Sequence, residues 1–194
     1  MFPIPAATRI LLLINVAVYG LQLFDDGGAL ENYFALWPFA SDRFEPWQIL
    51  TYGFLHGSPT HLLFNMLALV MFGGDVERVW GRDRFLTYFL VCVVSAGLVQ
   101  LLVTAWAGSS ESTIGASGGV FGLLLAFGLL FPRRKLLLIF PPIPMPAWAF
   151  VTMYGVLELF LGVTGSQADV AHFAHLGGML GGYLLIRYGR TRRS

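Results

Sequence analysis

Six long apolar segments, separated by polar or charged turns, constrain this chain more than any other feature of its sequence. An α-helix needs about 20 apolar residues to cross a hydrocarbon layer of about 30 Å. Charged residues make up only 12% of the chain, against about 25% in soluble domains. The sequence therefore predicts an all-α membrane protein, with residues 1–194 forming a single domain that is a polytopic bundle of six transmembrane helices. The predicted spans are residues 6–24, 61–79, 85–106, 115–131, 147–163 and 170–188.

The longest polar segment, residues 25–60, separates the first two apolar segments. It carries five of the eleven acidic residues, which makes it too polar to span a bilayer. It also contains two tryptophans and two tyrosines, and rings of this kind favour the membrane–water interface. We therefore expect a structured loop that lies partly in the interface.

The distribution of basic residues predicts the orientation in the membrane. Of the twelve Lys and Arg residues, eleven flank the apolar segments on one side, and only Arg43 falls on the other. Because basic residues accumulate on the cytoplasmic side, we expect both termini in the cytoplasm and residues 25–60 outside. The first segment lacks a basic leader and a clear cleavage site, so we expect it to be retained as a span. The eleven basic residues are Arg9, Arg78, Arg82, Arg84, Arg133, Arg134, Lys135, Arg187, Arg190, Arg192 and Arg193.

The same sequence argues against several other classes of protein. A net charge of +1, with no basic face beside stacking aromatics, gives no support for nucleic-acid binding. The single cysteine, Cys92, excludes an intramolecular disulfide, and we expect it to be a small core residue. No internal repeat is evident, which weighs against a transporter that uses buried histidines and Glu158.

Ser117 stands between small residues at the start of the fourth apolar segment, in a Gly-x-Ser-x-Gly pattern that begins at Gly115. Such a pattern lets a substrate carbonyl approach both the serine oxygen and nearby backbone N–H groups. The pattern alone is weak evidence, because glycine and serine also serve close helix packing in membranes. Ser117 is therefore a candidate nucleophile that needs support from elsewhere in the chain.

Polar residues on two other segments fall at nearly the same expected depth. At 1.5 Å per residue, Ser117 lies roughly 22 Å from Pro132 at the cytoplasmic end of its segment. His175 and Asn65 lie roughly 18 Å from the cytoplasmic ends of theirs, and His61 is one turn higher than Asn65. Ionisable groups inside a membrane usually face the bundle interior and mark function. We therefore expect one water-accessible cavity in the outer half of the bilayer.

The spacing of the polar residues along their helices predicts different roles for them. His61 and Asn65 are i and i+4, so they share a helix face from which both can donate hydrogen bonds to an oxyanion. Interhelical polar contacts are the alternative for this pair. His175 begins a stripe that continues with Gly178 and Gly182, and glycines allow close approach of a neighbouring helix.

The fourth segment offers Gly118 and Gly122 as a matching small surface for this stripe. Close contact would bring the Ser117 hydroxyl within reach of His175, which could remove its proton and return that proton to a leaving amine. His172 is the rival base, one turn earlier and nearer the outer surface. Phe121, one turn from Ser117, either packs against the imidazole or simply fills the core.

Glu158, on the fifth segment and roughly 17 Å from Ala147, is expected to form a structural pair. No acidic residue is an obvious partner for His175, which favours a Ser–His dyad over a triad. Two histidines and one carboxylate, without a His-Glu-x-x-His helix, are thin evidence for zinc. We therefore expect no metal and no other cofactor.

Three motifs occur in a fixed order along the apolar segments. They are His61-x-x-x-Asn65, Gly115-x-Ser117-Gly118 and Ala174-His175-x-Gly177-Gly178-x-x-x-Gly182. Because of these motifs, the chain resembles the rhomboid family of intramembrane serine proteases. The resemblance covers about residues 47–182 and is to the basic bacterial form with six helices.

This resemblance implies a function and assigns roles. Ser117 would be the nucleophile and His175 the base and acid, with His61, Asn65 and the Ser117 N–H as oxyanion donors. Phe121 falls on the aromatic position that supports the histidine. The implied substrates are transmembrane proteins cut within or near their membrane span. The implied location is a bacterial-type inner membrane, in contact with lipids, with the active site opening to the outer side.

Two positions of the outer loop complete the comparison with the family. His56 falls in the family's outer loop, before the helix of His61. Gln48 stands where the family often has Arg, a departure that bears on how the loop is anchored. Relatives that have lost catalysis act by binding client proteins, so a non-proteolytic client-binding protein is the alternative function.

Overall fold

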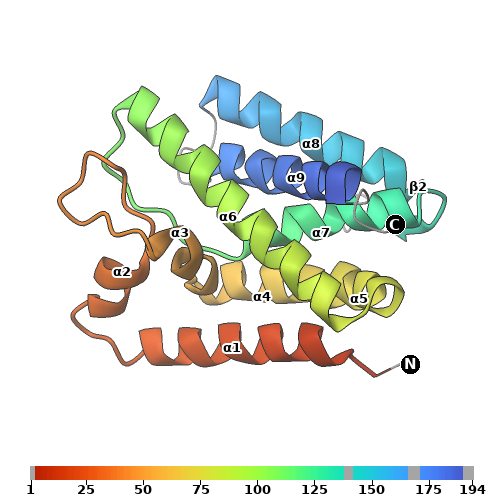
Figure 1. Ribbon diagram of the computed structural model, residues 1–194, viewed down its shortest axis with the longest axis horizontal. Coiled ribbons are helices and arrows are strands. Elements are labelled where there is room, and N and C mark those ends of the chain that lie inside the picture. The colour runs from red at the N-terminus through yellow and green to blue at the C-terminus, as the bar shows by residue number, and fades with distance from the viewer. Residues whose placement is uncertain (1–2, 138–141, 166–170, 190–194) are drawn as a thin grey trace.

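The computed structural model describes residues 3–137, 142–165 and 171–189, and its architecture is a bundle of helices (Figure 1). All six predicted segments are helical, which confirms a mainly α-helical fold. Residue 170, the predicted start of the last segment, and the basic residues beyond 189 lie outside the described residues. The corresponding helices are α1 (Ala6–Gln22), α4 (Pro59–Ala68) continued by the π-helix η2 (Leu69–Gly73) and α5 (Gly74–Trp80), α6 (Arg82–Ala107), α7 (Ser117–Leu130), α8 (Ala147–Thr164) and α9 (His172–Tyr188).

Two of these helices, α6 and α8, are long and apolar enough to cross a membrane, while α1 and α7 are shorter apolar helices. The number of spans therefore stays a prediction. The polar segment between α1 and α4 contains short helices, while its position at the membrane interface stays a prediction. It holds α2 (Ala29–Phe34), α3 (Gln48–Thr51) and the 3₁₀ turn η1 (Tyr52–Phe54).

A small antiparallel hairpin joins α7 to α8 and was not expected from the sequence. Its strands are β1 (Lys135–Leu137) and β2 (Pro144–Pro146), with Leu136 opposite Met145. Proline lacks a backbone N–H and disfavours helix, so the prolines here keep β2 extended. Among the described residues, β1 and β2 form the one β-sheet, and the other named elements are helices.

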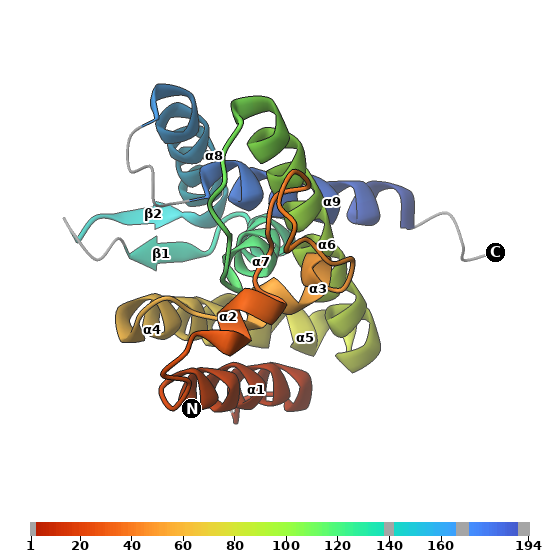
Figure 2. The same cartoon turned by 90° about the vertical axis from the view of Figure 1, so that its left-hand side faces the viewer.

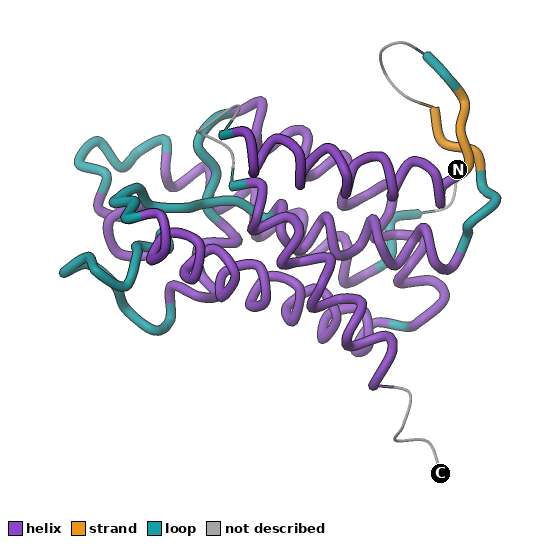
Figure 3. Tube along the Cα trace, turned by 90° about the horizontal axis from the view of Figure 1, so that it is seen from above, coloured by secondary structure: helices purple, strands orange, loops and turns teal. Residues whose placement is uncertain are grey.

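The connections divide between two ends of the bundle (Figures 1 and 3). The segment that holds α2 and α3 lies at one end together with the α6–α7 connection. Leu36 and Thr113 exchange backbone hydrogen bonds of 3.0 and 2.9 Å there. The hairpin, the beginning of α1 and the end of α9 lie at the opposite end (Figure 1). This arrangement separates the polar loop from the hairpin and the beginning of the chain.

Helix α7 lies inside the bundle, between α4 on one side and α8 and α9 on the other (Figure 2). Its start contacts α9 closely, because both helices carry glycine there. A Cβ atom on Gly178 would overlap the carbonyl oxygen of Gly118. Gly182 differs from the expectation, since its Cβ position meets Tyr88 of α6 instead of α7. Cys92 is buried beside them, as expected of a small core residue.

Buried polar groups hold the remaining parts together. The Glu77 carboxylate of α5 accepts hydrogen bonds from the backbone N–H groups of Ala7 and Thr8, at 2.9 and 2.7 Å. It also accepts one from the Thr8 hydroxyl at 2.8 Å. An anion at this position suits the positive end of a helix and satisfies N–H groups that have no acceptor within α1. Glu77 therefore ties the start of α1 to α5.

Gln48 anchors the polar loop from within. Its side chain is 1% exposed. The amide oxygen accepts from the backbone N–H groups of Trp37 and Glu45, at 3.3 and 3.2 Å. The amide nitrogen donates to the carbonyl oxygens of Tyr33 and Arg43, at 3.3 and 2.8 Å. Glutamine thus satisfies four backbone groups of the loop.

The substitution Gly178→Ala tests the contact between α7 and α9. We expect it to lower the free energy of unfolding by about 3 kcal/mol or more, because the new methyl group meets backbone that cannot rotate away. Gly155→Ala on α8 is the control, since its Cβ would lie 3.6 Å from the flexible Met179. Denaturant titration in detergent measures both. Equal stability of the two variants would contradict the close contact.

The substitution Gln48→Leu tests the loop anchor. It leaves four backbone groups without their partner, so we expect a loss of about 2–4 kcal/mol. We also expect faster cleavage by trypsin at Arg43 within the loop. Gln100→Leu on α6 is the matched control, and equal digestion rates for the two variants would rule out the anchoring role.

Candidate active site

Ser117 is the first residue of α7, and the chain reaches it through a backbone conformation that favours glycine. Gly115 has φ of 128°, in a region where side chains are strained. Its N–H donates to the carbonyl oxygen of Tyr52 at 2.9 Å. The first N–H groups of a helix have no acceptor within it and form its positive end. The start of α7 therefore presents both a hydroxyl and backbone donors.

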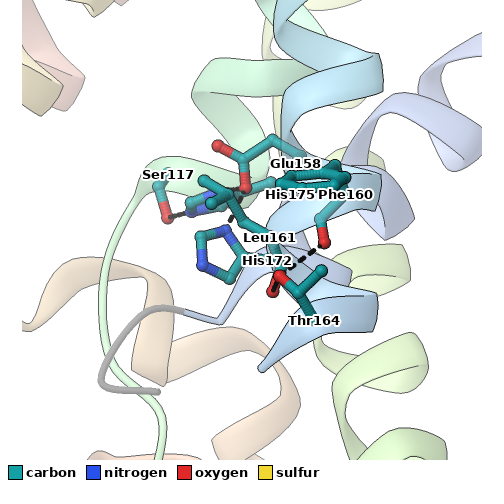
Figure 4. Close-up of polar contacts among 7 residues, drawn as sticks. All are labelled: Ser117, Glu158, Phe160, Leu161, Thr164, His172 and His175. Atoms are coloured by element: carbon teal, nitrogen blue, oxygen red, sulfur yellow. Dashed lines mark hydrogen bonds and ion pairs between the residues drawn. The ribbon is translucent and has the colours of Figure 1, made fainter. Parts of the chain in front are cut away.

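Ser117 and His175 lie within hydrogen-bonding distance, although they are far apart in the sequence. The distance from Ser117 Oγ to His175 Nε2 is 2.8 Å (Figure 4). The His175 side chain stacks on the ring of Phe121, with centroids 4.3 Å apart and planes inclined by 6°. Phe121 therefore packs against the imidazole, which was one of its two predicted roles, the other being simple core packing. The stacking fixes the plane in which Nε2 meets the hydroxyl.

Glu158 of α8 is the partner of both histidines of α9. Its Oε2 atom lies 2.8 Å from His175 Nδ1 and 2.7 Å from His172 Nδ1 (Figure 4). From the sequence we expected a structural pair for Glu158 but no acidic partner for His175, and the second expectation was wrong. One signal was present in the sequence. Glu158 lies roughly 17 Å from Ala147 at the start of α8, and His175 lies roughly 18 Å from Arg187 near the end of α9, so the two have nearly equal depth. Equal depth alone does not say which helix faces which.

His172, the rival base, points its Nδ1 at Glu158, and its ring centre lies 6.3 Å from that of His175. His175 is the imidazole whose nitrogen lies 2.8 Å from Ser117 Oγ. The geometry therefore favours His175 as the base.

The same cluster is where a metal ion would find ligands. In the described part of the chain, Glu158, His172 and His175 offer three ligand atoms within 4.8 Å of one another. However, both Nδ1 atoms already lie at hydrogen-bonding distance from a single carboxylate oxygen. Hydrogen bonding thus accounts for the arrangement without an ion.

His61 is oriented to act as a hydrogen-bond donor near Ser117. Its Nδ1 accepts a long bond of 3.5 Å from the Gly57 N–H, which leaves the proton of a neutral ring on Nε2. A Cβ on Gly115 would lie 2.8 Å from His61 Nε2 and 3.8 Å from Ser117 Oγ, so both groups lie close to the Gly115 backbone. Asn65 is buried one turn along α4. Its Nδ2 donates to the His61 carbonyl oxygen at 3.1 Å and has a second N–H to give.

His56 packs beside His61 and is 1% exposed, with ring centres 5.0 Å apart. Neither of its ring nitrogens has a hydrogen-bond partner among the described residues. Its backbone is held instead by Gln22, whose side chain bonds the N–H at 3.0 Å and the carbonyl oxygen at 3.2 Å. The pKa of His56 is lowered to about 4, mainly by burial and secondly by repulsion from a protonated His61. The ring is therefore neutral at pH 7.

Three known proteins to which this chain is similar are rhomboid proteins. A family model described as the Rhomboid domain matches residues 43–192. The chain is similar to Rhomboid protein 1, mitochondrial, of Saccharomyces cerevisiae, with 34% identity over 179 residues, which are 90% of this chain and 50% of that protein. RHOMBOID-like protein 4 of Arabidopsis thaliana is 33% identical over 141 residues, 73% of this chain and 33% of the relative. Rhomboid protease GlpG of Photorhabdus laumondii is 28% identical over 173 residues, 87% of this chain and 57% of the relative.

These matches cover most of this chain but less of each relative. The chain spans between 33% and 57% of the length of the three proteins. The matched region runs from the polar loop before α3 to the end of α9. It therefore contains every residue of the candidate active site.

The buried neutral ring of His56 makes stability depend on pH. The unfolded chain takes up a proton near pH 6.5, whereas folded His56 does so only near pH 4. The contribution of neutral His56 to the free energy of unfolding is therefore fully present above about pH 6.5 and is lost as the pH falls towards 4. We expect wild type to lose about 2 kcal/mol more than His56→Leu between pH 7 and pH 5. Denaturant titrations at the two pH values measure this difference, and parallel losses in both proteins would disprove it.

Proposed function

The chain belongs to the rhomboid family, and we propose that it is an intramembrane serine endopeptidase that cleaves transmembrane proteins within or near their membrane span. The observation that carries the proposal is the 2.8 Å contact between Ser117 Oγ and His175 Nε2. A nucleophile and a base at this distance, with backbone donors beside them, are what acyl transfer requires.

The first half of the reaction forms an acyl-enzyme. The Ser117 oxygen attacks the scissile carbonyl carbon while its proton passes to His175 Nε2. The resulting tetrahedral intermediate collapses when the C–N bond breaks, and His175 gives the proton to the leaving amine. In the second half, water attacks the ester, His175 takes its proton, and the Ser117 oxygen leaves with that proton.

Three sources of hydrogen bonds would stabilise the oxyanion. The Ser117 N–H lies at the positive end of α7. His61 Nε2 is the second donor, since the point where a Cβ on Gly115 would lie is 2.8 Å from it and 3.8 Å from Ser117 Oγ. Asn65, on the His61 face of α4, supplies the third donor through its second amide hydrogen. Donors fixed before the reaction stabilise developing charge with little reorganisation, and losing one costs about 10²–10³ in kcat.

The proposed setting is a bilayer crossed six times by one domain of residues 1–194, with cytoplasmic termini and the site opening to the outer side. Many large apolar side chains point outward from α1, α6 and α8, which suits contact with lipid. A helical substrate hides its carbonyls in hydrogen bonds, so it must unwind to reach Ser117. Exposed apolar residues include Leu13, Leu21, Leu98, Leu102, Val156, Leu159, Phe160 and Val163.

The substitutions Ser117→Ala and His175→Ala test the dyad. Removing either group takes away the nucleophile or its base, so we expect cleavage of a model single-span substrate in liposomes to fall by about 10³-fold or more. Ser110→Ala, in the exposed loop before α7, is the matched control and should cleave like wild type. His172→Ala should retain measurable cleavage, and a metal chelator should have no effect.

Two outcomes would contradict this proposal. Full activity of Ser117→Ala, combined with inhibition by the chelator, would replace the dyad by a metal site at Glu158, His172 and His175. A wild-type protein that binds several substrates without cleaving any of them would favour a client-binding function.

A further inference from the structure

Glu158 is an unusual residue in its surroundings. Helix α8 exposes most of its large apolar side chains and buries Ala147, Val151 and Glu158. A buried carboxylate loses free energy of hydration unless it is paired and hydrogen-bonded. Its partners are the Nδ1 atoms of His172 and His175. A single carboxylate therefore connects α8 to two positions of α9.

The contact with His175 determines where the proton of this imidazole lies. An ionised carboxylate only accepts hydrogen bonds, so at 2.8 Å His175 Nδ1 must carry the hydrogen. A neutral imidazole has one N–H, which leaves a lone pair on Nε2. That lone pair faces Ser117 Oγ at 2.8 Å and can accept its proton. The opposite tautomer would present an N–H to the hydroxyl and could not act as a base.

We infer that Glu158 is a positioning residue for His175, which holds the imidazole in the Nδ1–H tautomer and stabilises its cation after it takes the Ser117 proton. The inference rests on the proposed function. It extends the dyad by a carboxylate that belongs to a third helix. Glu158 acts through His175 and does not itself contact the reacting atoms.

Electrostatics supports the second part of this role. The titratable groups that face His175 in the described part of the chain are Glu158 of α8, His172 of its own helix and His61 of α4. Glu158 is the carboxylate among them. Charges interact more strongly where water is excluded. The Glu158 anion therefore favours the cation that His175 forms during attack.

His172 holds the carboxylate from the other side. It lies 2.7 Å from the same Oε2 atom that His175 contacts at 2.8 Å. Because this oxygen accepts hydrogen bonds from two rings of the same helix, both rings fix the orientation of the carboxylate. His172, Glu158, His175 and Ser117 thus form one hydrogen-bonded series across α9, α8 and α7 (Figure 4).

Kinetics of two Glu158 variants provide the first test. Glu158→Leu removes both the acceptor and the charge, so we expect kcat to fall by about 10²–10⁴ with KM within about twofold of wild type. In Glu158→Gln the amide oxygen still accepts the Nδ1–H, but the charge is lost. We therefore expect a loss of about tenfold in kcat, and the acid limb of the pH–rate profile should move to lower pH.

Histidine ¹⁵N spectra of the folded protein provide the second test, which does not depend on cleavage. The spectra distinguish a protonated ring nitrogen from one with a lone pair. We expect His175 to be Nδ1–H in wild type and in Glu158→Gln. In Glu158→Leu the signals should shift towards a mixture with the Nε2–H form.

Thr152→Val is the matched control, because Thr152 is an exposed polar residue of α8 that bonds its own helix at Trp148 O, at 2.9 Å. It should change neither kcat nor the spectra. A Glu158→Leu variant that cleaves like wild type would overturn the inference. So would a slow variant in which His175 keeps the wild-type tautomer, since Glu158 would then only tether α8. If wild type itself fails to cleave, the proposed function fails, while the spectra still report on the tautomer.

Discussion

The structure depends on a backbone-to-backbone contact between α7 and α9. There is no room for a side chain at position 178, because a Cβ there would overlap the carbonyl oxygen of Gly118. A membrane offers little hydrophobic drive for helices to associate, so small residues that permit close packing carry more of that task. This contact lies one residue from Ser117 and three from His175. The packing of two helices therefore sets the distance between hydroxyl and imidazole.

Buried ionisable groups follow the opposite logic, because each must be paired where water is scarce. Glu77 meets the first N–H groups of α1, and Glu158 meets the two histidines of α9. The first carboxylate serves helix association, whereas the second lies beside the candidate nucleophile. His56 is the exception, since its buried ring nitrogens have no hydrogen-bond partner in the described part of the chain. Its neutral state links the stability of the fold to pH.

The helices and the Ser117–His175 pairing were predictable from the sequence for physical reasons. Apolar segments of membrane-spanning length must be helical, since their backbone groups have no other partners in lipid. The glycines near Ser117 and His175 indicated a close helix contact. The partner of Glu158 was not predictable, because α8 is apolar on nearly every side and its composition does not indicate which face meets α9. Gly182 was assigned to the wrong neighbour for a similar reason, since spacing does not say which of two adjacent helices a glycine faces.

The proposed mechanism requires Ser117 to be a nucleophile that is activated within the bundle. Its most direct test is to treat the protein in lipid bilayers with a fluorophosphonate and to locate the modified residue by mass spectrometry. We expect one adduct, on the Ser117 oxygen, and its loss in a folded His175→Ala protein. An adduct on another serine, or cleavage of substrate by a protein whose Ser117 never reacts, would contradict it.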